Sequence, residues 1–208
     1  MIDVIIISEA ITPALHRMTQ QAIDSAHQCT QAPVRVIVVE RTQHLYRNAV
    51  ILHDEQPFNY NRLVNLAIRN ASTSHDIVVA NNDVEFLKGS IPIMAQSRPL
   101  VVSPVDPSGP VSVDGIEFGT KVARHFMGWC FLIRRKIWDY LGGFNEIYPF
   151  WCADNVVVDQ LKSIGVTPAI CGDAKVYHHV SATLNLRSFE EQNELTQVAL
   201  KRYNQGAS

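Results

Sequence analysis

Short apolar runs alternate with longer amphipathic stretches through the first half of the chain. The run at 2–7 has five aliphatic residues among six. Similar runs lie at 34–39, 49–53 and 76–80. Runs of this kind predict buried strands. Between them, Thr12 followed by Pro13 is a typical helix start, and 58–71 has apolar positions at helical spacing. The alternation predicts an α/β fold, with a mostly parallel central sheet and helices on both faces.

The second half predicts further strands and helices around one long connection. Residues 106–119 are rich in Pro, Gly and Ser and predict a surface loop or hairpin. Apolar runs predict strands at 99–104, 125–134, 167–171 and 175–179. Helical patterns lie at 136–141, 152–164 and 188–203. We expect Ser188 to cap the last of these helices. With no internal repeat and no shift in composition, we expect a single domain over 1–208 whose C-terminal helix lies in 186–208.

The composition is that of an ordinary globular chain. Of 208 residues, 47% are hydrophobic, and 18 Lys and Arg against 20 Asp and Glu leave a net charge of −2. The hydrophobic content argues against intrinsic disorder, and the near-neutral charge gives no basis for general nucleic-acid binding. No apolar run reaches the roughly 18 residues of a membrane span, and the start lacks the pattern of a signal peptide. We expect a cytoplasmic protein, and a peripheral contact with a membrane stays open.

Polar residues follow three of the predicted strands. They are Ser8-Glu9, Glu40-Arg41 and Asn81-Asn82-Asp83. Ligands of open α/β sheets bind outside the carboxyl ends of the strands, so these residues are candidates for a binding site. A carboxylate preceded by two amides offers the hard oxygen ligands that Mg²⁺ and Mn²⁺ prefer. Taken alone, the tripeptide fits a polar turn that satisfies its own backbone groups better than it fits a metal site.

Two later segments carry candidate chemistry of their own. His178 and His179 end a strand, where alternation sends their side chains to opposite faces. One imidazole could bind a metal, although a histidine at such a place is more often structural. Asp154 begins a helix directly after Phe150 and Trp151. It fits either a helix-capping residue or a general base flanked by aromatic rings that could stack on a sugar.

Several common catalytic motifs are missing from the sequence. Neither GxGxxG nor GxxxxGK[ST] occurs, which argues against a nicotinamide dehydrogenase and a P-loop NTPase. The absence of GxSxG argues against a hydrolase with a nucleophile elbow. Arg134-Arg135-Lys136 is the one tight basic cluster, and we expect it to face solvent at a strand–helix junction.

Four segments in the right order resemble motifs of family 2 glycosyltransferases with the GT-A fold. The resemblance extends over roughly residues 1–185. It is carried by 57–67 with 78–85 (Phe-Asn-Tyr and Asn-Asn-Asp), 128–146 (Gly and Arg, then Gly-Gly-Phe-Asn-Glu), Ala153-Asp154, and 177–183 (His-His-Val-Ser-Ala-Thr). The resemblance implies an inverting, metal-dependent transferase that uses a nucleotide-diphosphate sugar.

The resemblance also implies roles for individual residues. Asp83 and His178 would bind Mn²⁺ or Mg²⁺, and Asp154 would be the catalytic base. The nucleotide-sugar donor, for which a UDP-sugar is favoured, would be bound by Ser8, Glu9, Glu40, Asn59, Asn65, Asn81 and Asn82. The sequence departs from the family at Asn81 and Ala153, where Asp and Glu are usual, and at Val156, where a second Asp is usual.

Within this resemblance, 1–105 would be the nucleotide-sugar-binding half and 106–185 the acceptor half. The acceptor stays open between a glycan, a lipid-linked sugar, a protein and a modified nucleic-acid base, and an oligomer is possible. Two alternatives remain. One is a catalytically silent GT-A domain that binds a sugar or nucleotide. The other is a sugar nucleotidyltransferase, although such enzymes carry a basic Gly-rich loop where this chain has 8–13.

Overall fold

The computed structural model describes residues 1–179 and 189–206 of the chain. The strands are β1 (Ile2–Ser8), β2 (Val34–Glu40), β3 (Val50–His53), β4 (Asp76–Asn81), β5 (Val84–Phe86), β6 (Val101–Val105), β7 (Ile116–Phe118), β8 (Cys130–Ile133) and β9 (Ala169–His178). The helices are α1 (Pro13–Gln28), α2 (Tyr60–Asn70), α3 (Ser90–Gln96), α4 (Arg135–Leu141), α5 (Ala153–Ser163) and α6 (Phe189–Gly206). None of the described helices is long and apolar enough to cross a membrane.

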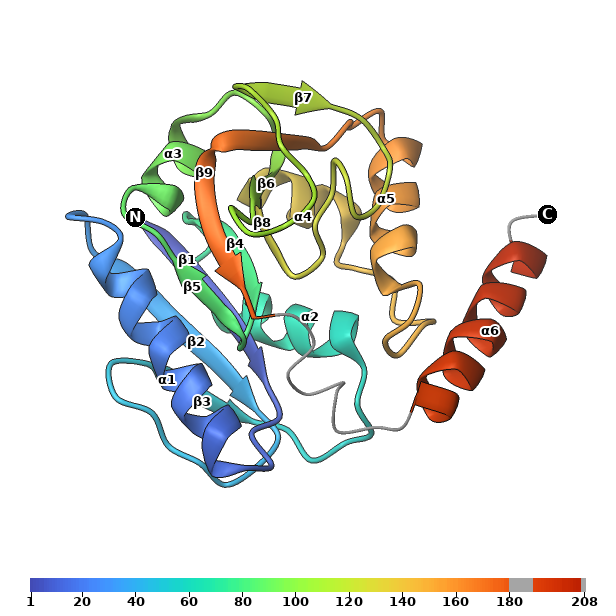
Figure 1. Cartoon of the computed structure of the whole chain (residues 1–208), viewed down its shortest axis with the longest axis horizontal. Coiled ribbons are helices and arrows are strands. Elements are labelled where there is room, and N and C mark those ends of the chain that lie inside the picture. Colours follow the sequence, from blue (N-terminus) through green and yellow to red (C-terminus); the bar gives the residue numbers. More distant parts are fainter. Residues whose placement is uncertain (180–188, 207–208) are drawn as a thin grey trace.

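The strands form one nine-stranded sheet in the order β3-β2-β1-β4-β8-β6-β9-β5, with β7 beside β9 (Figure 1). The strands from β3 to β4 are parallel to one another, as is the β6–β9 pair. β8 runs antiparallel between β4 and β6. The predicted α/β fold is confirmed, with the parallel alignment concentrated in the first half of the chain.

Helices cover both faces of the sheet because the strands are apolar on both sides. In β1, Ile5 and Ile7 pack on the side of α2, α4 and α5. The intervening Val4 and Ile6 pack on the side of α1 and α3. Both layers are closed to solvent, as expected for strands that read as continuous apolar runs. With both faces of these strands packed, ligands of the parallel part are expected at the strand ends.

Helix α6 lies outside these layers, beside α5 and away from the sheet (Figure 1). The hydroxyl of Tyr203 in α6 donates a hydrogen bond to Asp159 of α5. The Tyr203 ring also meets the ring of Tyr148 edge-on at 6.1 Å between centroids. The expected cap at Ser188 lies outside the described residues.

Three predicted strands have different bounds in the structure. The strand expected over 125–134 is wrong in its first part, because 121–126 form a tight turn in which Ala123 has a φ of 59°. The strands expected at 167–171 and 175–179 are one strand, β9. Gly172 lies near the middle of β9, where a glycine suggests that the strand ends. A Cβ at this position would lie 1.8 Å from the carbonyl oxygen of Val113. Glycine is therefore required by a close chain contact and not by a turn.

The basic cluster is also corrected by the structure. The side chains of Arg134 and Arg135 are only 16% and 12% exposed. The Arg134 guanidinium donates to Asp76 Oδ2 at 2.8 Å, and the backbone N–H of Arg135 donates to Asp76 Oδ1 at 3.0 Å. The expectation that both arginines face solvent is wrong, since they fasten the start of β4 to the end of β8.

Candidate functional site

The polar ends of three neighbouring strands meet at one edge of the sheet. Ser8 of β1 pairs in register with Glu40 of β2, and Ile7 of β1 pairs with Asn81 of β4. The chain leaves β1 toward β2 on one side and returns as β4 on the other. Such a reversal of strand order opens a crevice at the strand ends, which is where ligands bind in α/β sheets.

Glu40 is fully buried at this edge and is held by the chain itself. Its Oε1 accepts hydrogen bonds from the N–H of Ala10 at 3.2 Å and of Thr42 at 2.8 Å. Its Oε2 accepts one from the Tyr46 hydroxyl at 2.6 Å. Burial opposes ionisation, but these donors outweigh it and lower the pKa of Glu40. Glu40 is thus an ionised anchor for two loops, and its contact with a nucleoside stays a prediction.

Ser8 and Asn82 belong to a buried polar cluster at the same edge. The hydroxyls of Ser8 and Thr19 lie 3.0 Å apart. Asn82 Nδ2 donates to Thr19 Oγ1 at 3.0 Å and to Ser8 Oγ at 3.4 Å. The cluster fixes the turn that follows β4, which also carries Asp83. Sequence reasoning missed Thr19, although a polar residue between Leu15 and Ala22 on the apolar face of α1 is a signal that could have found it.

Asp83 and His178 face each other where β5 pairs with β9. Their Oδ1 and Nε2 atoms lie 3.4 Å apart, and both side chains are largely buried. The pairing of Val84 with His178 sets this approach, and the N–H of His179 donates to the carbonyl oxygen of Asp83 at 2.8 Å. Among the described residues, Nε2 of His178 has no hydrogen-bond partner.

A carboxylate oxygen and an imidazole nitrogen at this separation are a donor set that fits Mn²⁺ or Mg²⁺, with the nitrogen favouring Mn²⁺. Within 1–179 and 189–206, no group of three or more His, Cys, Asp or Glu could hold a metal. Among those residues, Asp83 and His178 are therefore the pair that could hold an ion, and a bound ligand or water could supply further coordination positions. His179 turns away, with its Nε2 3.8 Å from Glu85 Oε2.

Asp154 lies in the first turn of α5 with its carboxylate against Gly128. A Cβ at Gly128 would be 2.1 Å from Asp154 Oδ1, so only glycine leaves room for the carboxylate. The helix begins after Cys152, and no side chain caps it, so Asp154 is not the capping residue. Desolvation by burial raises the pKa of Asp154 to about 6. A carboxylate with such a pKa is ionised at neutral pH and is a stronger base than an exposed one.

Tyr60 brings the two carboxylates into one neighbourhood. Its hydroxyl is buried and donates to the carbonyl oxygen of Gly128 at 3.1 Å. Burial raises the pKa of Tyr60 well above its ordinary value, and the charges of Asp154 and Asp83 raise it further. The charges of Asp83, in the first half of the chain, and of Asp154, in the second half, therefore both raise the pKa of the Tyr60 hydroxyl.

Three aromatic rings, those of Phe58, Phe150 and Trp151, contact one another in series before Asp154. The rings of Phe58 and Phe150 meet at 5.9 Å, and those of Phe150 and Trp151 at 5.0 Å. Phe150 is 42% exposed. At the other end, the guanidinium of Arg41 lies 5.6 Å from the centre of the Phe58 ring and pairs with Glu9 at 2.6 Å. Arg41, a candidate because of its position after β2, is a further charged group at this edge.

Asn59 and Asn65 fasten α2 to the segment 142–146. Asn59 caps α2, and its Nδ2 donates to the carbonyl oxygen of Glu146 at 2.7 Å. Asn65 is buried, donates to the carbonyl oxygen of Phe144 at 2.7 Å and accepts from its N–H at 2.8 Å. Contact of either amide with a nucleotide sugar stays a prediction, and for Asn65 it would require these bonds to break.

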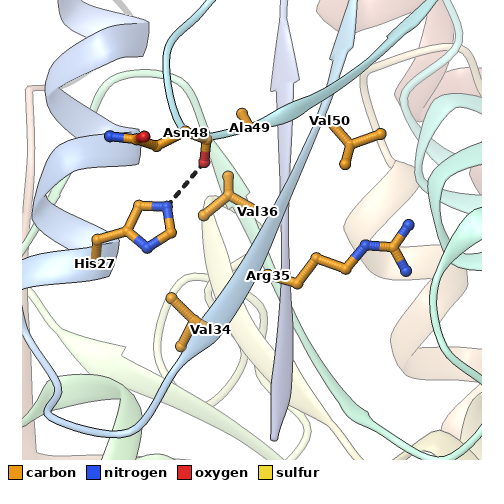
Figure 2. A pocket seen from close by; sticks show the side chains of 7 residues that line it. All are labelled: His27, Val34, Arg35, Val36, Asn48, Ala49 and Val50. Carbon is orange, nitrogen blue, oxygen red and sulfur yellow. Dashed lines mark hydrogen bonds between the residues drawn. The ribbon is translucent and has the colours of Figure 1, made fainter.

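A hollow of about 350 Å³ lies far from these residues, at the other end of β2. Figure 2 shows His27 and Asn48 on one side of the β2 ribbon and the guanidinium of Arg35 directed to the other. His27 bonds to the carbonyl oxygen of Asn48 at 2.9 Å. With aliphatic side chains as the rest of its lining, this hollow brings no reactive groups together.

No family model matches the sequence, and no curated protein matches it either. Solved structures do match. A structure of GalNAc-T7 with UDP, GalNAc and Mn²⁺ has a TM-score of 0.66 and 11% identity, over 85% of this chain and 42% of that one. A mannosyltransferase from Pyrobaculum calidifontis in complex with GDP-Man and Mn²⁺ has a TM-score of 0.64 and 15% identity, over 87% and 57%. The chain has a GT-A fold.

A third structure, of a Drosophila galactosyltransferase 7 mutant with manganese, UDP-Gal and xylobiose, has a TM-score of 0.55 and 13% identity. That match covers 93% of this chain and 79% of the other. The chain thus spans less than two thirds of the first two structures, at 42% and 57% of their length. At these identities the similarity concerns the fold.

Proposed function

We propose that this protein is a family 2-type glycosyltransferase that moves a sugar from a nucleotide-diphosphate sugar to an acceptor hydroxyl with inversion. The observation that carries the proposal is that Asp83 faces His178 while Asp154 lies against Gly128, the neighbour of Trp129, whose carbonyl oxygen accepts a hydrogen bond from Asn81 at the end of β4. Asp83 and His178, 3.4 Å apart, are a pair that suits a metal ion, and Asp154 is a base with a raised pKa. The charges of Asp83 and Asp154 both raise the pKa of Tyr60. The fold that the chain shares with two glycosyltransferases, whose structures contain Mn²⁺ with UDP and GalNAc or with GDP-Man, supports the proposal.

Asp83 and His178 would hold Mn²⁺ or Mg²⁺, and the diphosphate of the donor would complete the coordination. Such an ion neutralises the negative charge that gathers on a diphosphate leaving group. The buried cluster of Ser8, Thr19 and Asn82 keeps the turn with Asp83 in place. With that turn held, little ordering remains to be done when the donor binds.

Asp154 would accept the proton of the acceptor hydroxyl as its oxygen attacks the anomeric carbon. One base and one displacement give inversion at that carbon, because the attack comes from the face opposite the leaving group. Gly128 supports this role because, without a side chain, it lets the Asp154 carboxylate approach the backbone. Burial raises the pKa of Asp154 and so makes it a stronger base. Asp154 is ionised at pH 7 and becomes inactive as a base when it is protonated below about pH 6.

The two halves of the chain would divide the substrates between them. Residues 1–105 contribute the strand ends and would bind the donor, for which a UDP-sugar is favoured. Residues 106–185 contribute Asp154 and would bind the acceptor. The aromatic rings of Phe150 and Trp151 stand just before Asp154 and offer flat apolar faces on which an acceptor could stack.

The first test is a thermal-shift panel of UDP, GDP, CDP and dTDP, each with Mn²⁺ and with EDTA. A nucleotide at about 100 times its dissociation constant adds roughly 2.7 kcal/mol of stability, which shifts the melting temperature measurably. We expect one nucleotide to stabilise the wild type only with Mn²⁺, and Asp83→Asn to abolish this effect. Stabilisation by no nucleotide would refute the proposal. Stabilisation without hydrolysis or transfer of the matching nucleotide sugar would favour the silent binding module.

A further inference from the structure

Trp129 lies flat against the imidazole of His178. The two ring centroids are 4.7 Å apart and the planes differ by 10°. The carbonyl oxygen of Trp129 accepts a hydrogen bond from the N–H of Asn81 at 2.9 Å. Trp129 therefore contacts the end of β4 through its backbone and the end of β9 through its side chain. The turn with Asp83 begins at the end of β4, so Trp129 contacts the chain next to Asp83 as well as the ring of His178.

Within the described residues, no hydrogen bond holds the His178 ring. A metal-binding histidine is usually oriented by a hydrogen bond from its second ring nitrogen to a neighbouring oxygen. Here the flat contact with the indole restricts the rotation of the imidazole instead. The indole itself is fixed, because it packs against the apolar cluster of Val105, Met127 and Ile170. The indole face therefore lies against an imidazole whose Nε2 is 3.4 Å from Asp83 Oδ1.

We propose that Trp129 is a positioning residue for the metal site, and this inference rests on the proposed function. Its indole face holds the His178 imidazole in the orientation that binds the ion. The same face stabilises the positive charge that the imidazole acquires on binding, because an aromatic face attracts a cation. The hydrogen bond to Asn81 uses the backbone of Trp129, so side-chain substitutions leave that bond in place and isolate the contribution of the ring.

Tryptophan fluorescence tests the contact directly. A paramagnetic ion on His178 quenches an indole stacked on that ring, so titration with MnCl₂ and UDP is expected to quench the wild type. Trp129→Phe should lose this quenching. Trp138→Phe is the matched control, since Trp138 packs on the opposite face of the sheet, and the absolute loss of its emission should equal that of the wild type. Equal quenching in Trp129→Phe and the wild type would overturn the proposal.

Metal affinity tests the positioning role. Free Mn²⁺ measured by electron paramagnetic resonance, with UDP present, should give about 10-fold weaker binding for Trp129→Leu. Trp129→Phe should bind within about 3-fold of the wild type, because a phenyl ring keeps a flat face toward His178. Thermal melting checks that both variants are folded. Should Trp129→Leu fail to fold, Trp129→Met replaces it, since it keeps an apolar side chain without a flat face: about 10-fold weaker binding supports the role, and wild-type affinity refutes it.

One further measurement separates this inference from the proposed function. In the metal-free protein, the indole ring current should shift the imidazole proton signals of His178 upfield, and Trp129→Leu should remove that shift. A wild type that shows the shift but binds no Mn²⁺ with any of the four nucleotides refutes the metal site, and with it any positioning role. A wild type that binds Mn²⁺ no better than Trp129→Leu refutes the role of Trp129 alone.

Discussion

Replacing Asp154 with Asn should make the protein more stable and nearly inactive at the same time. The free carboxyl titrates near 3.8, and burial raises the folded-state pKa to about 6. At pH 7 the unfolded chain carries the charge in water, whereas the folded chain carries it in a desolvated place. This pKa difference corresponds to a free energy of unfolding that is about 3 kcal/mol lower at pH 7. A neutral amide of the same shape avoids that loss.

The pH dependence gives the sign of this effect. Because the folded-state pKa is raised, the folded chain binds the proton more tightly, and the contribution to stability is fully present below about pH 4. It is lost as the pH rises through about 6. The advantage of Asp154→Asn should therefore be about 3 kcal/mol at pH 7, fall to about half at pH 5, and vanish below pH 4.

Urea unfolding of both proteins at pH 7 and pH 5, followed by circular dichroism, measures these differences. Asp173→Asn is the control, since Asp173 is exposed on β9 and its substitution should leave the free energy of unfolding unchanged. Transfer by Asp154→Asn should fall by about 100-fold to 10,000-fold, as for loss of a general base. Equal stability of Asp154→Asn and the wild type at pH 7 would refute the burial argument, and wild-type transfer would remove Asp154 from the mechanism.

Three other substitutions follow from contacts in the site. Gly128→Ala should displace the Asp154 carboxylate, since the new Cβ would lie 2.1 Å from its oxygen. Transfer assays should show a loss of activity of at least about 10-fold. The thermal shifts caused by nucleotides should stay as in the wild type. Thr19→Val should lower the free energy of unfolding by about 1–3 kcal/mol in urea, because the Asn82 amide loses a buried partner; an unchanged value would contradict it. Asn65→Leu should cost more than about 2 kcal/mol by the same measurement, because both amide atoms are bonded in the core.

The sequence predicted the strand ends well because that part of the fold is local. Apolar runs, helix starts and the alternation of strands and helices are properties of short segments, and parallel strands place their carboxyl ends together. Ser8, Glu40 and Asn81 meet at one edge as this reasoning expects. Thr12 caps α1 through a 3.2 Å hydrogen bond to the N–H of Leu15, which is also as expected.

The chemistry of the site depended on contacts between distant segments. No local pattern places His178 3.4 Å from Asp83, or Gly128 under the carboxylate of Asp154. Here the family resemblance supplied the candidates. The amides show the opposite case. Asn65 was a candidate ligand because of its type and motif, yet its side chain is bonded to the backbone of Phe144. A polar residue that recurs in a motif can serve packing as well as binding, and only the contacts distinguish the two.

The position of β8 has a consequence for how the chain folds during synthesis. β8 comes from residues 130–133 but lies between β4 and β6, which are complete by residue 105. Until β8 emerges from the ribosome, β4 and β6 lack the strand that joins them, and each presents unpaired backbone groups. The donor half cut at residue 105 should therefore aggregate instead of folding on its own, because β4 and β6 are joined only when β8 is made and β5 is paired only when β9 is made.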